Sequence, residues 1–158
     1  MEPRAFRLRA LRHVGALLAA LLIPCATLAT LGEPVASVAA DRRALAAKPG
    51  AHTDLGGFTV ETVMTGAATV REYVATSGMV FAIAWSGLAH PDLGPLLGSY
   101  QADYRDALQQ AKRTPGRRRA QLQAGRLVVE RWGHMRDLHG LAYAPALVPP
   151  GVAVDDLR

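Results

Sequence analysis

Hydrophobic and polar residues alternate along two short segments in the middle of the chain. Residues 58–64 (FTVETVM) and 69–74 (TVREYV) are rich in β-branched side chains and switch between apolar and polar positions. A period of two residues is typical of strands with one buried face. The residues between them, TGAA at 65–68, suit a turn. The pattern therefore predicts two antiparallel strands joined by a hairpin.

A third segment, residues 79–85 (MVFAIAW), is apolar at every position. Alternation along a strand would place Met79, Phe81, Ile83 and Trp85 on one face and smaller side chains on the other. A strand that is apolar on both faces is normally covered on both, so we expect a central strand of an antiparallel meander. We interpret its bulky face as core. The alternative is that this face forms the floor of an apolar ligand groove.

Apolar residues recur at three- and four-residue spacing between residues 92 and 111. Asp92 is a suitable N-cap, and Pro95 falls in the first turn, where its missing N–H is tolerated. The spacing predicts one amphipathic helix that ends before Pro115 and Gly116. Its apolar stripe comprises Leu93, Leu96, Leu97, Tyr100, Tyr104, Ala107, Leu108 and Ala111.

Residues 126–132 and 134–143 predict two further strands, joined tightly at Gly133. The order β-β-β-α-β-β indicates an α+β fold, with an antiparallel sheet of about five strands and one amphipathic helix packed on one face. We place this domain at residues 58–145.

The segments on either side of the predicted domain lack a clear period. Residues 30–57 are rich in Ala, Gly and Pro and predict a flexible lead-in, although part of 35–47 suits a short helix. Residues 146–158 contain several prolines and predict an extended C-terminal tail. The Val and Leu side chains of this tail suit packing as a strap.

The N-terminus has the composition of a secretory signal peptide. Four arginines precede an uncharged run from Val14 to Ile23, which Pro24 closes. This run is shorter than the about 20 residues needed to cross a membrane. Small residues up to Ala29 predict cleavage after that residue. We therefore expect residues 1–29 to be removed, the protein to be periplasmic or secreted, and no transmembrane segment to remain. An uncleaved membrane anchor is the alternative.

The predicted cleavage changes the net charge and the cysteine content of the chain. The whole chain has a net charge of +5, with 18 Lys and Arg against 13 Asp and Glu. Residues 1–29 hold four of those cations and one of those acids, so the remaining 129 residues carry only +2. We therefore expect no nucleic-acid partner. Cys25, the only cysteine, is also removed, which excludes a disulfide or a thiolate nucleophile from the remainder.

Metal and catalytic motifs are absent from the sequence. The histidines after the leader are His52, His90, His134 and His139. The last two are five residues apart, which on one strand puts them on opposite faces, so they would not bind a metal together. No nucleophile elbow, phosphate loop or dinucleotide-binding pattern is present. We therefore expect no metal and no cofactor and assign no catalytic residue.

A small periplasmic enzyme with a site near His90, Asp92 and Tyr100 is the alternative reading of the same residues. Acid–base chemistry needs paired or perturbed titratable groups. Asp103 and Asp106 are one such candidate pair, one helical turn apart.

Glu61 and Glu72 form a second candidate pair if the first two predicted strands place them face to face. The predicted sheet also contains Arg71 and Arg131. Because opposite charges across neighbouring strands attract, we expect a cross-strand salt bridge rather than a catalytic dyad.

One cluster of cations stands out after the predicted helix. A functional interpretation is an anion-binding loop at residues 112–119 that makes the protein a peripheral binder of anionic surfaces. The structural alternative is a solvated loop whose charges suit the C-terminal end of the preceding helix. The possible anion-binding residues are Lys112, Arg113, Arg117, Arg118 and Arg119.

Two long segments, VREYVATSGMVFAIAWSGLAHPDLGPLLGSY at 70–100 and GHMRDLHGLAYAPALVPPGVAVDDLR at 133–158, resemble the DUF2844 family of short exported proteobacterial proteins of unknown function. The resemblance extends from about Phe58 to Arg158. It implies export and a single domain and brings no catalytic residue, cofactor or substrate. The Arg-rich loop and Trp132 depart from what the family leads us to expect.

These observations predict an uncharacterised exported envelope protein that acts as a non-catalytic binding or interaction module. Its expected partner is an envelope protein or a cell-surface polymer. The oligomeric state and the ligand do not follow from the sequence.

Overall fold

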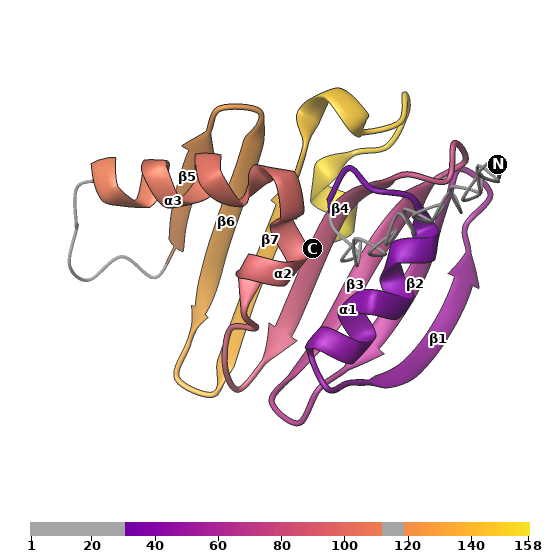
Figure 1. Cartoon of the computed structure of the whole chain (residues 1–158), viewed down its shortest axis with the longest axis horizontal. Helices are drawn as coiled ribbons and strands as arrows, with labels where there is room; N and C mark the ends of the chain where they lie inside the picture. The colour runs from indigo at the N-terminus through magenta and orange to yellow at the C-terminus, as the bar shows by residue number, and fades with distance from the viewer. Residues whose placement is uncertain (1–30, 112–118) are drawn as a thin grey trace, which may run out of the picture.

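Seven antiparallel strands form one sheet in the computed structural model, which describes residues 31–111 and 119–158 (Figure 1). Their order is β1-β2-β3-β4-β7-β6-β5, so two meanders meet where β4 pairs with β7. The predicted central strand, β4, has three strands on either side. The strands are β1 (Lys48–Asp54), β2 (Phe58–Met64), β3 (Ala68–Ala75), β4 (Val80–Gly87), β5 (Arg119–Ala124), β6 (Leu127–His134) and β7 (Asp137–Tyr143).

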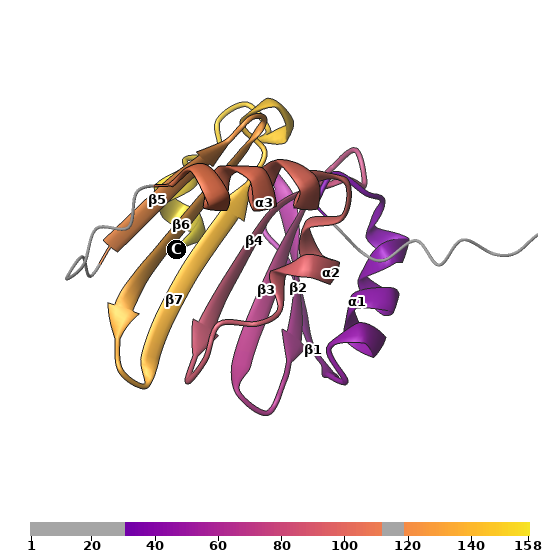
Figure 2. The same ribbon diagram turned by 60° about the vertical axis from the view of Figure 1, so that its left-hand side comes forward.

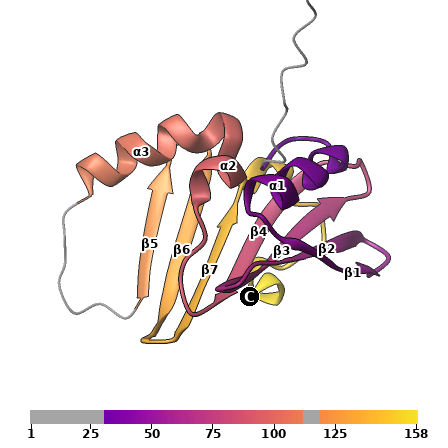
Figure 3. The same ribbon diagram turned by 60° about the horizontal axis from the view of Figure 1, so that its bottom comes forward.

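The helices lie on one face of the sheet, and the C-terminal segment lies on the other (Figures 2 and 3). Figure 1 shows α1 in front of β2 and β3, whereas α3 crosses β5 and β6. Within the described residues no helix combines the length and the apolar character needed to cross a membrane. The helical segments are η1 (Val35–Ser37), α1 (Val38–Ala44), α2 (Leu93–Leu97), η2 (Gly98–Tyr100), α3 (Gln101–Gln110), η3 (Pro145–Leu147) and η4 (Val154–Leu157).

The α+β class and the antiparallel sheet are confirmed, but the sheet has two more strands than predicted. Strand β1 lies in the segment that we interpreted as a flexible lead-in, which also forms η1 and α1. Every residue of β1 is exposed, so its sequence has no buried face to produce an alternating pattern. Backbone pairing with β2, interrupted by a bulge between Pro49 and His52, holds it in place. Strand β5 similarly has one buried residue, Ala124.

The single predicted helix is divided into α2 and α3. The break falls at Gly98, whose φ of +43° is in the left-handed region that glycine adopts at low cost. The first part of the predicted stripe is buried through Tyr100 and Tyr104, but Leu108 is 46% exposed. The change of direction at Gly98 explains why the stripe is not buried along its full length.

The core interpretation of the third apolar segment is confirmed, but its faces differ from the prediction. Phe81, Ile83 and Trp85 are at most 1% exposed. A bulge in β4 pairs Val74 with Val80 and Tyr73 with Ala82, which leaves Phe81 as the extra residue. Phe81 therefore packs on the face away from the helices, opposite Ile83 and Trp85. Strict alternation failed because a bulge shifts the side-chain register by one residue.

The C-terminal segment forms the second cover of the sheet. Tyr73 and Phe81 pack with Phe58 in an aromatic cluster whose ring centres are 5.8–6.2 Å apart. The Tyr73 hydroxyl donates a hydrogen bond to the carbonyl of the fully buried Leu157 at 2.9 Å. The tail therefore packs as a strap, with η3 and η4 within it, and shields the face that the helices leave open.

The last hairpin turns two residues later than predicted. Strands β6 and β7 pair as far as His134 with Asp137, so the turn consists of Met135 and Arg136. Arg136 has φ of +69° there. Gly133 is inside β6, where a Cβ atom would lie 2.1 Å from the carbonyl oxygen of Asp137. Its role is close backbone approach rather than turn formation.

Candidate functional site

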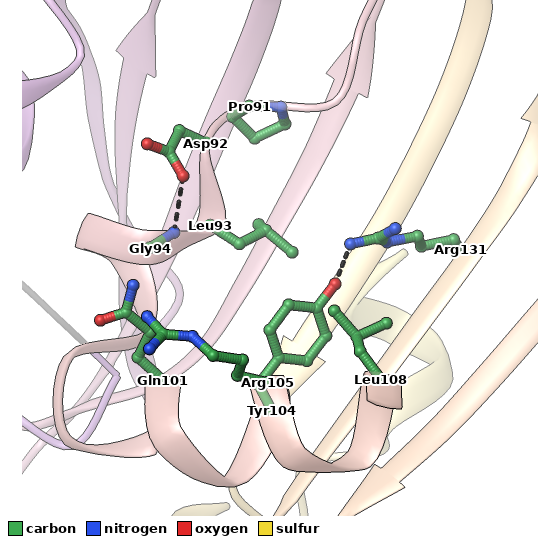
Figure 4. A pocket seen from close by; sticks show the side chains of 9 residues that line it. All are labelled: Pro91, Asp92, Leu93, Gly94, Gln101, Tyr104, Arg105, Leu108 and Arg131. Atoms are coloured by element: carbon green, nitrogen blue, oxygen red, sulfur yellow. Dashed lines mark hydrogen bonds between the residues drawn. The ribbon is translucent and has the colours of Figure 1, made fainter. Parts of the chain in front are cut away.

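A groove runs between the start of α2, helix α3 and strand β6 on the helical face of the sheet (Figure 4). Its volume of about 330 Å³ is at the small end of the range for ligand pockets, about 300–1,000 Å³. The groove is open to solvent and combines apolar, polar and cationic side chains. Its lining consists of Pro91, Asp92, Leu93, Gly94, Gln101, Tyr104, Arg105, Leu108 and Arg131.

Arg131 is a cation held in a defined position at the wall of this groove. It is paired with Gly140 across β6 and β7, and its guanidinium donates a hydrogen bond to the Tyr104 hydroxyl. Its Cζ lies 5.7 Å from the centre of the Tyr104 ring, which is a cation–π contact. Neither contact neutralises the guanidinium. Because the Tyr104 oxygen accepts from Arg131, its own O–H can donate to a ligand.

Arg105 supplies a second cation on the other side of Tyr104, where its side chain extends toward Gln101 (Figure 4). Within the described part of the chain neither Arg105 nor Arg131 is in a salt bridge. Asp92 is the one acid of this lining, and its carboxylate accepts a hydrogen bond from the Gly94 N–H at 2.9 Å. The groove therefore carries two separate cations without an anionic partner.

His90 lies beside the groove and is held by Trp85. The indole N–H donates to Nδ1 of His90 at 2.8 Å, and the indole packs on Gly140, where a Cβ atom would lie only 2.1 Å from the ring. Burial, and then the positive charge of Arg131, lowers the pKa of His90. The neutral ring therefore carries its proton on Nε2, and its accepting nitrogen is already used.

The structure does not bring together the three residues of the enzyme hypothesis. Asp92 lines the groove, whereas His90 is not part of the lining. Tyr100 is buried, with the Cζ of Arg126 5.1 Å from its ring centre. Tyr104, one turn further along, lies in the groove where we expected Tyr100.

One residue of the predicted anion-binding loop lies within the described chain. Arg119 is the first residue of β5, and its Nη2 donates to Oε2 of Glu130 at 3.1 Å. The charge of Arg119 is therefore paired with that of Glu130 on the sheet. The other residues of the loop lie outside the described residues, so their role in anion binding stays a prediction: Lys112, Arg113, Arg117 and Arg118.

Two of the histidines lie closer together than we expected. His134 and His139 are on different strands because the hairpin turns at residues 135–136, and both approach Asp137, at 3.7 and 2.8 Å. Even so, within residues 31–111 and 119–158 no group of three or more His, Cys, Asp or Glu side chains could hold a metal ion.

Glu61 and Glu72 are direct neighbours across β2 and β3, which meets the condition set for this candidate pair. The expected salt bridge from Glu72 to Arg71 or Arg131 does not form. Arg71 is adjacent to Glu72 along the strand and so points to the opposite face, and Arg131 is in the groove over β6. Glu61 instead contacts Nδ1 of His52 at 2.5 Å. Glu72 is fully buried.

The other candidate carboxylate pair, Asp103 and Asp106, lines another hollow beside α3. Its volume is about 280 Å³, and Arg126 is also part of its lining. Within the described residues no salt bridge joins these acids to Arg126.

The sequence did not reveal that three residues lie together in the groove: Tyr104, Arg105 and Arg131. Tyr104 was interpreted as part of the core stripe, and Arg131 as a salt-bridge partner within the sheet. A signal was present, since Arg131 follows the buried Val129 at the strand period and therefore faces the helices. Which helical residue it meets depends on the crossing of α3 over β6, which no local pattern reveals.

The groove and the sheet lie within a recognised family region. The chain matches the family described as Protein of unknown function (DUF2844) over residues 27–157. It belongs to this family. The match confirms the resemblance noted from segments 70–100 and 133–158 and includes every element of the fold. No curated protein and no solved structure matches the chain.

Proposed function

We propose that this DUF2844 protein is an exported, non-catalytic binding module whose groove between α3 and β6 binds a cell-surface polymer that carries carboxylate groups. The observation that carries the proposal is the pair of cations without anionic partners, Arg131 fixed on Tyr104 and Arg105 on its other side. Guanidinium groups pair with carboxylates in charge-assisted hydrogen bonds, which are stronger than neutral ones.

A polymer suits this groove better than a single small anion. The two guanidinium groups lie on opposite sides of Tyr104, so they are arranged to meet two separate charges rather than clamp one (Figure 4). The apolar side chains of Leu93 and Leu108 lie between and beside the polar groups, as expected for contact with the carbon skeleton of a sugar. The open form of the groove leaves room for a chain to continue past it.

The state of His90 supports a binding role rather than catalysis. A general base must have an accepting atom within reach of the proton that it removes. Nδ1 of His90 is occupied by the Trp85 indole, and Asp92 is engaged at the start of α2. His90 therefore has no free accepting nitrogen with which to act as a general base, whereas Asp92 uses one of its two carboxylate oxygens at the start of α2.

Binding of oligogalacturonate, compared with an uncharged glucan oligomer of the same length, tests the ligand class. We expect the charged oligomer to bind, added salt to weaken the binding, and Arg105→Gln to raise its Kd about tenfold, which corresponds to about 1.4 kcal/mol. Arg43→Gln, a change of an exposed cation on α1, is the matched control and should leave the Kd unchanged. Equal affinity for both oligomers, or equal effects of the two variants, would contradict the proposal.

Export is tested separately. We expect the protein recovered from the periplasm or the medium to begin at Thr30, as measured by mass spectrometry of the intact chain. The family match begins at residue 27, which supports a leader distinct from the shared domain. Recovery of a chain that retains residues 1–29 in the cytoplasm would contradict this part of the proposal.

A further inference from the structure

Two carboxyl groups are buried beneath α1 without any hydrogen-bond partner. Asp41 of α1 and Glu72 of β3 are both 0% exposed. All four of their carboxyl oxygens are unpartnered among the described residues. Buried polar groups in folded proteins nearly always have a partner, so this arrangement calls for a specific explanation. The groups belong to two elements packed on one another, since α1 lies over β2 and β3 (Figure 1).

The groups around this pair do not supply a full counter-charge. Arg42, on α1 itself, is a cation whose charge acts on Glu72, but its Nε is also buried without a partner. Strand β2 contributes Glu61, a second acid next to Glu72, and β1 contributes His52, which is bound to Glu61. Helix α2, which packs against α1, has the sequence LGPLL and contributes no charge. The acids therefore outnumber the cations that face them.

These surroundings favour the neutral form of both acids. Burial, and then the charge of Glu61, raises the pKa of Glu72 to about 7, although Arg42 opposes the shift. Burial, and then the charge of Glu72, raises the pKa of Asp41 to about 9. Glu72 therefore ionises first as pH rises, and Asp41 then faces a buried negative charge. Ionising either group beneath the helix is costly because no donor compensates for the lost water.

Helix α1 is tethered at both ends by contacts that do not involve these acids. Before the helix, the N–H groups of Gly32 and Val35 donate to the carbonyls of Val80 and Gly78 at 2.8 Å. After the helix, β1 pairs with β2. The turn between α1 and β1 holds Ala46 at φ of +47°, a conformation that residues with a side chain rarely adopt. These contacts would hold the chain on either side in place if the helix left the sheet. Departure of the helix would expose Val38, which is 3% exposed in the docked helix.

We propose that α1 is a pH-operated cover, docked on β2 and β3 while Asp41 and Glu72 are protonated and released when both ionise. A group that is more easily protonated in the docked state makes that state most stable at low pH. Docking is therefore strongest below pH 4, weakens as Glu72 ionises, and is lost as Asp41 ionises near pH 9. Release uncovers the sheet face around Glu72 and leaves the groove over β6 intact.

Nuclear magnetic resonance of the purified protein between pH 5 and 10 tests this device. We expect the side-chain carboxyl carbons of Glu72 and Asp41 to titrate in that order, with midpoints above 6. Amide hydrogen exchange in residues 38–44, corrected for the intrinsic effect of pH, should accelerate at least tenfold from pH 6 to pH 9. Exchange in the central strand β4 should stay constant, because release of α1 is local.

Matched variants distinguish the release of α1 from a general loss of structure at high pH. Asp41→Asn should abolish the acceleration, whereas Asp106→Asn, at an exposed acid on α3, should retain it. If Asp41→Asn does not fold, Glu72→Gln provides the same comparison. We expect the acceleration of exchange in α1 to be smaller in Glu72→Gln than in the parent protein. Carboxyl midpoints below 5, constant protection of α1 up to pH 9, or full acceleration in Asp41→Asn would each overturn the proposal.

Discussion

Two glutamates are almost completely buried on opposite faces of the same sheet, and they behave in opposite ways. Glu72 lies beneath α1 without a partner, and its pKa is raised to about 7. Glu130 lies beneath the C-terminal segment, 4% exposed, and accepts hydrogen bonds from Arg158 at 2.7 Å and Arg119 at 3.1 Å. Burial alone would raise the pKa of Glu130, but these two bonds outweigh it and lower the pKa.

The difference teaches that burial alone does not decide what a carboxyl group does for this fold. At Glu130 the anion fastens the tail to β6, since Arg158 also lies 5.9 Å from the centre of the Trp132 ring. At Glu72 the neutral acid permits α1 to pack, and the anion opposes it. The same residue type is thus a clamp on one face and a release device on the other, because the neighbouring elements supply donors in only one case.

Removing the clamp should have the largest effect. We expect Glu130→Gln to lower the free energy of unfolding at pH 7 by about 3 kcal/mol, because two charge-assisted hydrogen bonds are lost. The pKa of Glu130 is lowered in the fold, so its contribution is present above the ordinary pKa and lost as pH falls through the lowered value. Urea denaturation at pH 7 and pH 3 measures both effects. Glu33→Gln, at an acid without a salt bridge among the described residues, is the control.

Glu72→Gln should have the opposite sign. Its raised pKa means that stability is fully present below pH 4.5 and declines as pH rises through about 7. The amide cannot ionise, so we expect the variant to be more stable than the parent by about 1–2 kcal/mol at pH 8, after the cost of burying an unpartnered amide. Thermal unfolding at both pH values measures this gain. A loss of stability at pH 8 equal to that at pH 4.5 would contradict the comparison.

The capping carboxylate of Asp92 should have a smaller effect than either buried acid. Its side chain is exposed and accepts one bond from the Gly94 N–H at the start of α2. We expect Asp92→Ala to lower stability by about 1 kcal/mol, as is typical of an N-cap. Asp92→Asn should keep most of that contribution, because the amide oxygen still accepts. Chemical denaturation of the pair distinguishes a cap from a buried charge, for which the amide would not substitute.

Local patterns were sufficient to predict five of the seven strands and the burial of Phe81, Ile83 and Trp85. Each of these strands has a buried face, and burial produces the period of two residues. Strand β1 was missed because it has no buried face, and β5 because it buries only its last residue. The bulge at Phe81 was missed because one inserted residue leaves no trace in composition.

The candidate site was only partly predictable. The groove lies beside Asp92, which the enzyme alternative named, but its role as a functional site stays a prediction. Glu61 and Glu72 meet the condition set for them, because their strands place them face to face. Tyr104 lines the groove in the place where we expected Tyr100. We attribute this difference to the break at Gly98, which changes the direction of the helix. Asp41 was not singled out, since an acid on a short helix gives no sign of burial until the helix is placed on the sheet.

By itself the sequence determined the fold class, the family and the antiparallel pairing of the central strands, because these depend on residue type and spacing along the chain. The leader stays a prediction. Only the tertiary structure decided which buried carboxyl groups have donors and which cations share the groove. Those properties depend on contacts between elements far apart in sequence, such as Glu130 with Arg158 and Arg131 with Tyr104. The interaction between two charges depends on their distance in space and not on their separation along the chain, so the partners of a charged group are known only after folding.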